Sequence, residues 1–143
     1  MIWYDLEIKL LDKNETGMEK MNYSNEYDRS DSKAGFDLIS QNVKVTRNAF
    51  IPFGIMARLI KVEQMSNSNI PLKTDSHFWL IPKTSMYNLG LIMGNSLGMV
   101  EKTFRDELKA PVWSMCGEVN VTNDSHFQIV APDMGWIRNV HIV

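Results

Sequence analysis

The segment from Gly94 to Leu108 contains residue types that could act on a small ligand. A Gly-Asn turn former begins it, and a carboxylate, Glu101, precedes an aromatic residue, Phe104, by three positions. We predict a hairpin whose second strand runs to Trp113, with backbone N–H and C=O groups at its mouth that could bind a flat heterocycle. The ring would then stack on a sugar while the carboxylate handles water or a metal ion. Taken alone, a core Phe104 and a solvated Glu101 form the simpler interpretation.

Other kinds of reactive site find little support in the residues. The three histidines, His77, His126 and His141, are far apart, and none is spaced from another as zinc ligands are. The single cysteine, Cys116, can form neither an internal disulfide nor a thiolate zinc site, and we expect a buried, small apolar residue. No nucleophile elbow and no phosphate-binding Gly-rich loop before a helix occurs.

Composition predicts a single domain over residues 1–143, long enough to bury a core. Fifteen basic and seventeen acidic residues give a net charge of −2 and no lysine-rich face, which argues against a nucleic-acid partner. No run of about 18 apolar residues is present, so we expect no membrane partner. Charges near the N-terminus argue against a signal peptide and favour a reducing compartment, cytoplasmic or nuclear.

Short runs with a hydrophobic period of two dominate the chain. The stretch 55–62 is apolar at both parities, so we predict a strand buried on both faces. A helix is expected only over residues 84–88, after Pro82. Glycines and prolines separate the runs, so the predicted fold class is all-β, a sandwich or barrel. The other positions expected on buried strand faces are Leu6, Ile8, Leu10, Val43, Val45, Leu108, Ala110, Val112, Phe127, Ile129, Trp136, Val140 and Ile142.

Two polar stretches interrupt this pattern. Residues 12–33 are rich in Asp, Asn, Glu, Lys and Ser, and we expect an irregular arm or loop there. Residues 63–77 are expected to form a surface loop.

Four motifs follow one another in a characteristic order. Residues 34–38 are Ala-Gly-Phe-Asp-Leu, and residues 82–86 are Pro-Lys-Thr-Ser-Met. Residues 94–108 begin Gly-Asn-Ser-Leu-Gly, and residues 123–129 are Asn-Asp-Ser-His-Phe-Gln-Ile. Residues 51–55, Ile-Pro-Phe-Gly-Ile, lie between the first two motifs. This ordered set resembles the homotrimeric dUTPase family, the dUTP diphosphatases, which are jelly-roll β-barrels.

The resemblance implies a site shared between subunits of a homotrimer, with Mg²⁺ as cofactor. Asp37 would lie near the metal, contacting it through water, and near the triphosphate. Lys83 would take the place of the second motif's arginine, and Thr84 or Ser85 would donate to phosphate oxygens. Gln128 would also contact phosphate.

The third motif implies the remaining roles. Asn95 and the hairpin backbone, including Gly98, would read the donor–acceptor edge of uracil. Phe104 would pack under the deoxyribose and leave no room for a 2′-hydroxyl. Glu101 would hold the water that attacks the α-phosphorus.

Several departures from the family pattern bear on catalysis. Glu101 stands where the family has aspartate, and a displacement of about 1 Å can cost about a hundredfold in rate. Lys83 lacks the bidentate fork of arginine. The fourth motif's arginine is replaced by His126 or Ser125, depending on the alignment. The family's glycine-rich fifth motif, which closes over the triphosphate, is expected to be absent after Val143.

These features predict a trimeric dUTPase-like protein, descended from hydrolysis of dUTP to dUMP and pyrophosphate, with hydrolysis weak or lost and a structural or assembly role. An active dUTP diphosphatase and a nucleotide-binding regulator are the alternatives, so enzymatic activity stays open. Expected partners are dUTP or dUMP, where the site is intact, and a protein of a larger assembly. Ten methionines and many asparagines are typical of an AT-rich genome, which favours a viral, virion-associated protein.

Overall fold

The computed structural model describes residues 1–11 and 31–143, and the regular secondary structure of this part is all strand apart from one short helix. The all-β expectation is confirmed. The helix expected over residues 84–88 is present as α2 (Thr84–Asn88). The strands are β1 (Ile2–Leu10), β2 (Gly35–Leu38), β3 (Val43–Val45), β4 (Asn48–Pro52), β5 (Ile55–Glu63), β6 (Leu72–Ser76), β7 (Phe78–Pro82), β8 (Leu91–Met93), β9 (Gly98–Val100), β10 (Lys109–Ser114), β11 (Val119–Val121), β12 (Phe127–Val130) and β13 (Ile137–Ile142).

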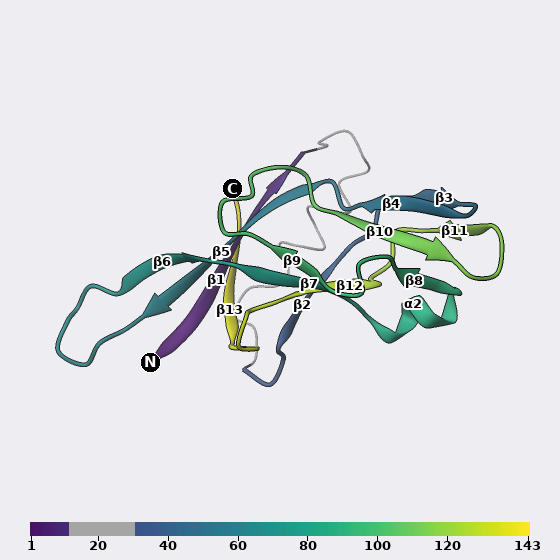
Figure 1. Cartoon of the computed structure of the whole chain (residues 1–143). Helices are drawn as coiled ribbons and strands as arrows, with labels where there is room; N and C mark the ends of the chain where they lie inside the picture. The colour runs from purple at the N-terminus through teal and green to yellow at the C-terminus, as the bar shows by residue number, and fades with distance from the viewer. Residues whose placement is uncertain (12–30) are drawn as a thin grey trace.

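The strands pair into four sheets, with the orders β13-β1-β5-β6, β2-β12-β7-β9, β4-β10-β8 and β11-β3. Figure 1 shows the first sheet at one end of the molecule and the last two, with α2, at the other. The sheet β2-β12-β7-β9 lies between them, and its strands include parts of all four sequence motifs. Among the described strands only β1 and β13 pair in parallel. None of the described helices is long and apolar enough to cross a membrane.

Alternation along β1 follows the prediction, with Leu6 and Ile8 fully buried and Leu10 half-buried. The prediction for β5 was wrong for part of one face. Leu59 is buried together with Ile55 and Ala57, and Val62 on the opposite face is buried as well. Met56 and Ile60 of that opposite face are only half-buried, because β5 belongs to a single sheet whose other face is partly open.

The predicted parity of β13 was right at Val140 but wrong at the start of the strand. Ile137 is fully buried together with Val140, whereas Trp136 and Ile142 are half-buried. The register between β1 and β13 shifts after Tyr4, so that Arg138 is an extra residue in the ladder. Such a bulge reverses the alternation, which a strict period of two cannot anticipate. The Arg138 guanidinium lies over the rings of Trp3 and Trp136, 4.9 and 5.2 Å from their centroids.

The surface loop predicted for residues 63–77 was wrong in its second half. Residues 72–76 form β6, which pairs antiparallel with β5 from Leu59–Ser76 to Glu63–Leu72. Every side chain of β6 is at least partly exposed, so its sequence carries no alternating apolar signal. Of the irregular arm predicted for residues 12–33, residues 12–30 lie outside the described part of the chain, and residues 31–33 begin with a turn.

The hairpin predicted from Gly94 to Trp113 was wrong as well. Its first arm, β9, pairs with β7, whereas β10 pairs with β4 and β8. The chain therefore crosses from one sheet to another between residues 100 and 109. The expected burial of Leu108, Ala110 and Val112 is confirmed.

The core beneath the central sheet is aromatic. The ring of Phe127 meets that of Phe53 edge-on, with centroids 5.3 Å apart and planes at 74°, and both residues are fully buried. Ile129 is also fully buried, while Gln128 between them is only half-buried. Strand β12 therefore fixes the position of Gln128, and of His126 just before the strand, through its buried side chains.

One buried hydroxyl ties β1 to the segment before β13. Tyr4 donates a hydrogen bond from Oη to Asp133 Oδ1 at 3.0 Å, and burial, with the Asp133 contact, raises the pKa of Tyr4 to about 12. Tyr4 therefore remains a neutral donor throughout the ordinary pH range.

Candidate functional site

A cavity of about 330 Å³ opens beside β9 and the segment that follows it. Its wall combines apolar side chains with a few polar groups, the usual make-up of a small-molecule site. Four predicted site residues, Asn95, Gly98, Glu101 and Phe104, meet there. The full lining is Phe50, Leu80, Met93, Asn95, Gly98, Met99, Val100, Glu101, Phe104, Glu107, Leu108 and Lys109.

Gly98 lies in the cavity wall where β9 closely approaches β7. It is buried and pairs with Leu80 of β7. A Cβ at this position would lie 3.1 Å from Met93 Cε and 3.3 Å from the Leu80 carbonyl oxygen. The missing side chain therefore allows β9 to approach β7 closely and leaves room in the cavity.

Glu101 and Phe104 lie on the outer side of the cavity. The Phe104 N–H donates to the Glu101 carbonyl oxygen at 3.0 Å, which closes a turn between the two residues. The Phe104 ring is 38% exposed and lines the cavity, so it could stack on a bound ring. Glu101 lines the cavity, and within the described residues its carboxylate makes no hydrogen bond or ion pair.

A second group of polar side chains gathers where β2, β7 and β12 adjoin. Lys83 Nζ lies 3.1 Å from Asp37 Oδ2 and donates to Ser125 Oγ at 3.3 Å. Ser85 Oγ lies 2.8 Å from His126 Nδ1. The first, second and fourth motifs thus meet in one place, and both candidates for the fourth motif's arginine position, Ser125 and His126, contact the second motif.

His126 cannot replace an arginine electrostatically. Burial lowers the pKa of His126 below its usual value, and Lys83 acts in the same direction while Asp124 opposes it. The imidazole is therefore neutral at pH 7 and serves Ser85 as a hydrogen-bond partner. Lys83 is left as the basic side chain of this group, and its charge is already opposed by Asp37.

The glycine of the first motif makes room for Gln128. A Cβ on Gly35 would lie 1.8 Å from Gln128 Oε1, so the amide occupies the space that any other residue would fill. Gln128 is also the register partner of Asp37. Thr84, in contrast, is exposed at the start of α2, and its hydroxyl has no partner within the described residues.

The two groups remain separate in one chain. The cavity lining includes neither Asp37 nor Lys83, and Ser85 and Gln128 are not part of it either. Strand β7 contributes Leu80 to the cavity and leads directly into Lys83. That the complete site forms between subunits stays a prediction.

The donor groups of the site suit Mg²⁺ in one mode only. No group of three His, Cys, Asp or Glu residues that could hold a metal ion occurs in the described residues. Mg²⁺ is often bound by one or two carboxylates together with substrate phosphates and water. Asp37, about half exposed, fits that mode as a single carboxylate beside a metal that arrives with a triphosphate.

One polar network near the site could not be predicted from the sequence. A network beside the turn of Glu101 joins residues far apart in the chain, which no local pattern links: Arg58, Asp75, His77 and Arg105.

The expected burial of Cys116 was wrong, because the thiol is exposed in a bend between β10 and β11.

Comparison with known proteins decides the fold. No protein-family profile matches the sequence, and no curated protein matches it. Among solved structures, a mutant dUTPase from phage phi11 of S. aureus covers 87% of this chain and 88% of its own, with 14% identity and a TM-score of 0.54. The chain has the dUTPase fold. The expected all-β, dUTPase-like jelly roll is thereby confirmed.

Two further dUTPases show the same likeness. The Streptococcus mutans dUTPase has a TM-score of 0.52 and 16% identity over 71% of this chain and 79% of its own. The EIAV dUTPase has a TM-score of 0.50 and 15% identity over 91% of this chain and 86% of its own. The dUTPase fold is thus shared at sequence identities that leave the residues of the site to be judged on their own chemistry.

Proposed function

We propose that this chain is a trimeric dUTPase-like protein, descended from Mg²⁺-dependent dUTP hydrolysis, that keeps a cavity for a deoxyuridine nucleotide but hydrolyses dUTP weakly or not at all. Its main role is then structural, within an assembly. The observation that carries the proposal is the contrast between the formed cavity and the unanchored carboxylate at its rim.

The cavity supports binding. Asn95 and the backbone around Gly98 offer hydrogen-bonding groups, and Phe104 offers a ring face. A volume of about 330 Å³ lies within the range of small-molecule sites, about 300–1,000 Å³.

The same surroundings argue against rapid hydrolysis. A general base acts only within hydrogen-bond reach of its water, and Glu101 is exposed, with no described partner to aim its longer side chain. Glu107 adds a second carboxylate to the cavity lining, opposed by Lys109 Nζ at 3.6 Å. A triphosphate therefore meets little favourable charge here.

The second polar group supports only a modest phosphate site. Lys83 would have to leave Asp37 to bind phosphate, and the pair is exposed enough for this to cost little. Mg²⁺, beside Asp37, would supply the charge that screens the triphosphate, and Lys83, Ser85 and Gln128 would orient its oxygens. The phage phi11 dUTPase is described with a structural Mg(II) ion.

Pyrophosphate release from dUTP with Mg²⁺ tests the proposal. We expect turnover at least about a hundredfold below that of the S. mutans dUTPase measured alongside, because the longer Glu101 side chain has no described partner that aims its carboxylate at a water. Calorimetry with a non-hydrolysable dUTP analogue should still show binding. Turnover equal to that of the S. mutans enzyme would establish the alternative, an active dUTP diphosphatase. If the chain shows neither binding nor turnover, the nucleotide-binding part of the proposal is wrong and only the assembly role is left.

Variants at Glu101 provide the control. Glu101→Gln should remove any residual turnover and leave analogue binding intact. Glu101→Asp, which restores the family's residue, should raise turnover if the longer side chain is the defect. An unchanged rate in both variants would contradict the role given to Glu101.

The outer face of the sheet β4-β10-β8 supports the trimer. Trp113 lies opposite Ile92, and Pro111 lies opposite Phe50, so these side chains form one face. Phe50 is 63% exposed, Ile92 48% and Trp113 45%, an unusual concentration for a sheet that faces only water. Second copies of this chain are the proposed occupants.

Light scattering at micromolar concentration should therefore give three times the chain mass of 16.5 kDa. Trp113→Glu should yield smaller species, because it places a charge in the apolar face. Arg47→Glu provides a matched control, since Arg47 is exposed on the turn before β4, and should leave the mass unchanged. A monomeric native chain would refute the trimer.

A further inference from the structure

The segment that carries Glu101 and Phe104 lacks the support of a sheet. Residues 101–107 lie between β9 and β10 and belong to no strand. Since those two strands pair in different sheets, no ladder of backbone hydrogen bonds crosses this segment. Something else has to hold its polar backbone groups in place.

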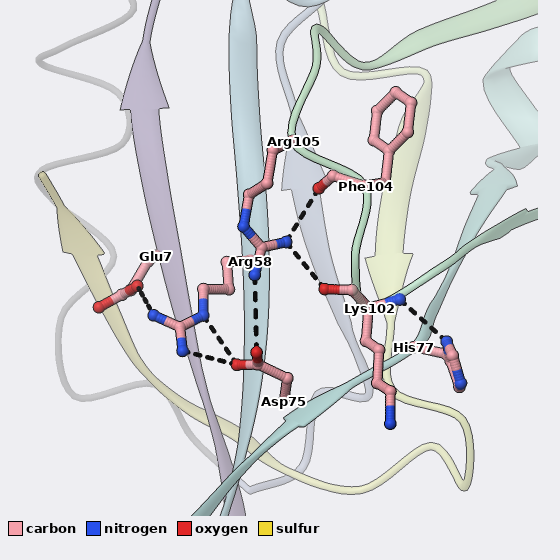
Figure 2. Close-up of polar contacts among 7 residues, drawn as sticks. All are labelled: Glu7, Arg58, Asp75, His77, Lys102, Phe104 and Arg105. Atoms are coloured by element: carbon pink, nitrogen blue, oxygen red, sulfur yellow. Dashed lines mark hydrogen bonds and ion pairs between the residues drawn. The ribbon is translucent and has the colours of Figure 1, made fainter.

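The side chains of Arg105 and His77 hold the backbone groups of this segment instead. The Arg105 guanidinium donates from Nη1 to the carbonyl oxygens of Lys102 and Phe104, at 2.8 and 2.9 Å. The backbone N–H of Lys102 donates to His77 Nδ1 at 2.9 Å. Figure 2 shows the guanidinium beside these two carbonyls while the Phe104 ring points away from the network.

The guanidinium of Arg105 is itself anchored. Its Nη2 lies 3.6 Å from Asp75 Oδ2 on β6. Asp75 is held in turn by Arg58 of β5, whose Nη2 and Nε lie 2.7 and 2.8 Å from Oδ1. Arg58 also reaches Glu7 of β1, with Nη1 3.3 Å from Oε1. Three neighbouring strands of one sheet thus support the turn through a chain of charges (Figure 2).

We propose that Arg105 is a positioning residue, which together with His77 fixes the backbone of the turn 101–104 and thereby the positions from which the side chains of Glu101 and Phe104 reach the cavity. The ligand-binding part of this inference rests on the proposed function. The fixing of the turn does not.

The hydrogen bonds of Arg105 should contribute more to holding the turn than its ion pair with Asp75 does. The guanidinium and the Asp75 carboxylate are both more than a third exposed, and exposed ion pairs contribute little. Nη1 of the planar guanidinium donates to both carbonyl oxygens while Nη2 lies toward Asp75, and the single nitrogen of a lysine cannot occupy both places. Arg105→Lys, which retains the charge, should therefore behave almost like Arg105→Ala.

Hydrogen–deuterium exchange of the full-length protein tests the fixing of the turn. In Arg105→Ala and Arg105→Lys the amides of Lys102 and Phe104 should exchange about tenfold faster than in the native chain, because the turn opens more often. Arg47→Ala removes an exposed arginine elsewhere and should change neither rate. Unchanged exchange in both Arg105 variants would overturn the inference.

His77 allows a rescue experiment. His77→Ala should speed exchange of the Lys102 amide, whereas His77→Asn, whose Oδ1 can accept the same hydrogen bond, should restore slow exchange. Equal exchange in these two variants would show that the Lys102 contact does not hold the turn.

Calorimetry with dUMP tests the consequence for the site. Both Arg105 variants should bind dUMP about tenfold more weakly, since a loosened turn no longer holds Phe104 in place at the cavity. Native affinity in variants whose turn exchanges fast would reduce the network to a structural role and overturn the positioning claim. If the native chain does not bind dUMP, the proposed function fails, and the exchange measurements alone decide whether Arg105 fixes the turn.

Discussion

Phe127→Ala should lower the free energy of unfolding by about 3–5 kcal/mol. The ring is fully buried, meets Phe53 edge-on and belongs to β12, the strand between β2 and β7. Truncation removes its apolar contacts and leaves a cavity that Phe53 and its neighbours can fill only in part. Denaturant unfolding followed by tryptophan fluorescence measures the loss from the shift of the midpoint.

Phe104→Ala supplies the matched control for this change. Its ring is 38% exposed and lines the cavity, so the same truncation should cost under about 1 kcal/mol. A loss below that value for Phe127→Ala would contradict the packing described for the central sheet. Because β12 also fixes His126 and Gln128, the destabilised variant should bind phosphate groups more weakly at temperatures where it is still folded.

Local signals predicted much of the fold. The alternation of β1 is visible in the sequence because one of its faces is fully buried and the other carries Glu7 and Lys9. The helix over residues 84–88 was predicted with its bounds, since Pro82 ends β7 and the next residues favour a helical turn. Both features depend on residues that are neighbours in the chain.

Features set by distant partners could not be predicted in this way. Strand β6 has only partly exposed or exposed side chains, and its pairing with β5 alone defines it. The extra residue in β13, Arg138, is visible only in the register with β1. The supposed hairpin after Gly94 failed for the same reason, because pairing with β7 and β4 separates its two arms.

In the candidate site, too, some features could be predicted from the sequence and others depend on distant partners. The resemblance to dUTPases selected residues that meet in the structure, with Asn95, Gly98, Glu101 and Phe104 around one cavity. It could not show that Lys83 faces Asp37. Nor could it show that Arg105 is anchored beside the turn, because its partner Asp75 lies on β6, a strand that the sequence pattern does not predict.

Gly98→Val should weaken dUMP binding by about 10–100-fold. A Cβ at this position already lies 3.1–3.3 Å from Met93 and Leu80, which both line the cavity, so two further methyl groups must project into it or displace its wall. Overfilling of a packed space costs about 1–3 kcal/mol, which corresponds to that loss of affinity. Calorimetry with dUMP gives the change directly.

The stability of the same variant separates loss of the cavity from loss of the fold. Valine is a favourable strand residue, so Gly98→Val should unfold within about 1–2 kcal/mol of the native chain. Leu97→Val, just before β9 and outside the cavity lining, is the matched control and should bind dUMP like the native protein. If folded Gly98→Val binds dUMP with native affinity, the nucleotide occupies another place, and the roles of Asn95 and Phe104 fall with it. A graded loss from Gly98→Ala to Gly98→Val, in contrast, would locate the base or sugar against β9, because only a ligand in that space meets the added methyl groups.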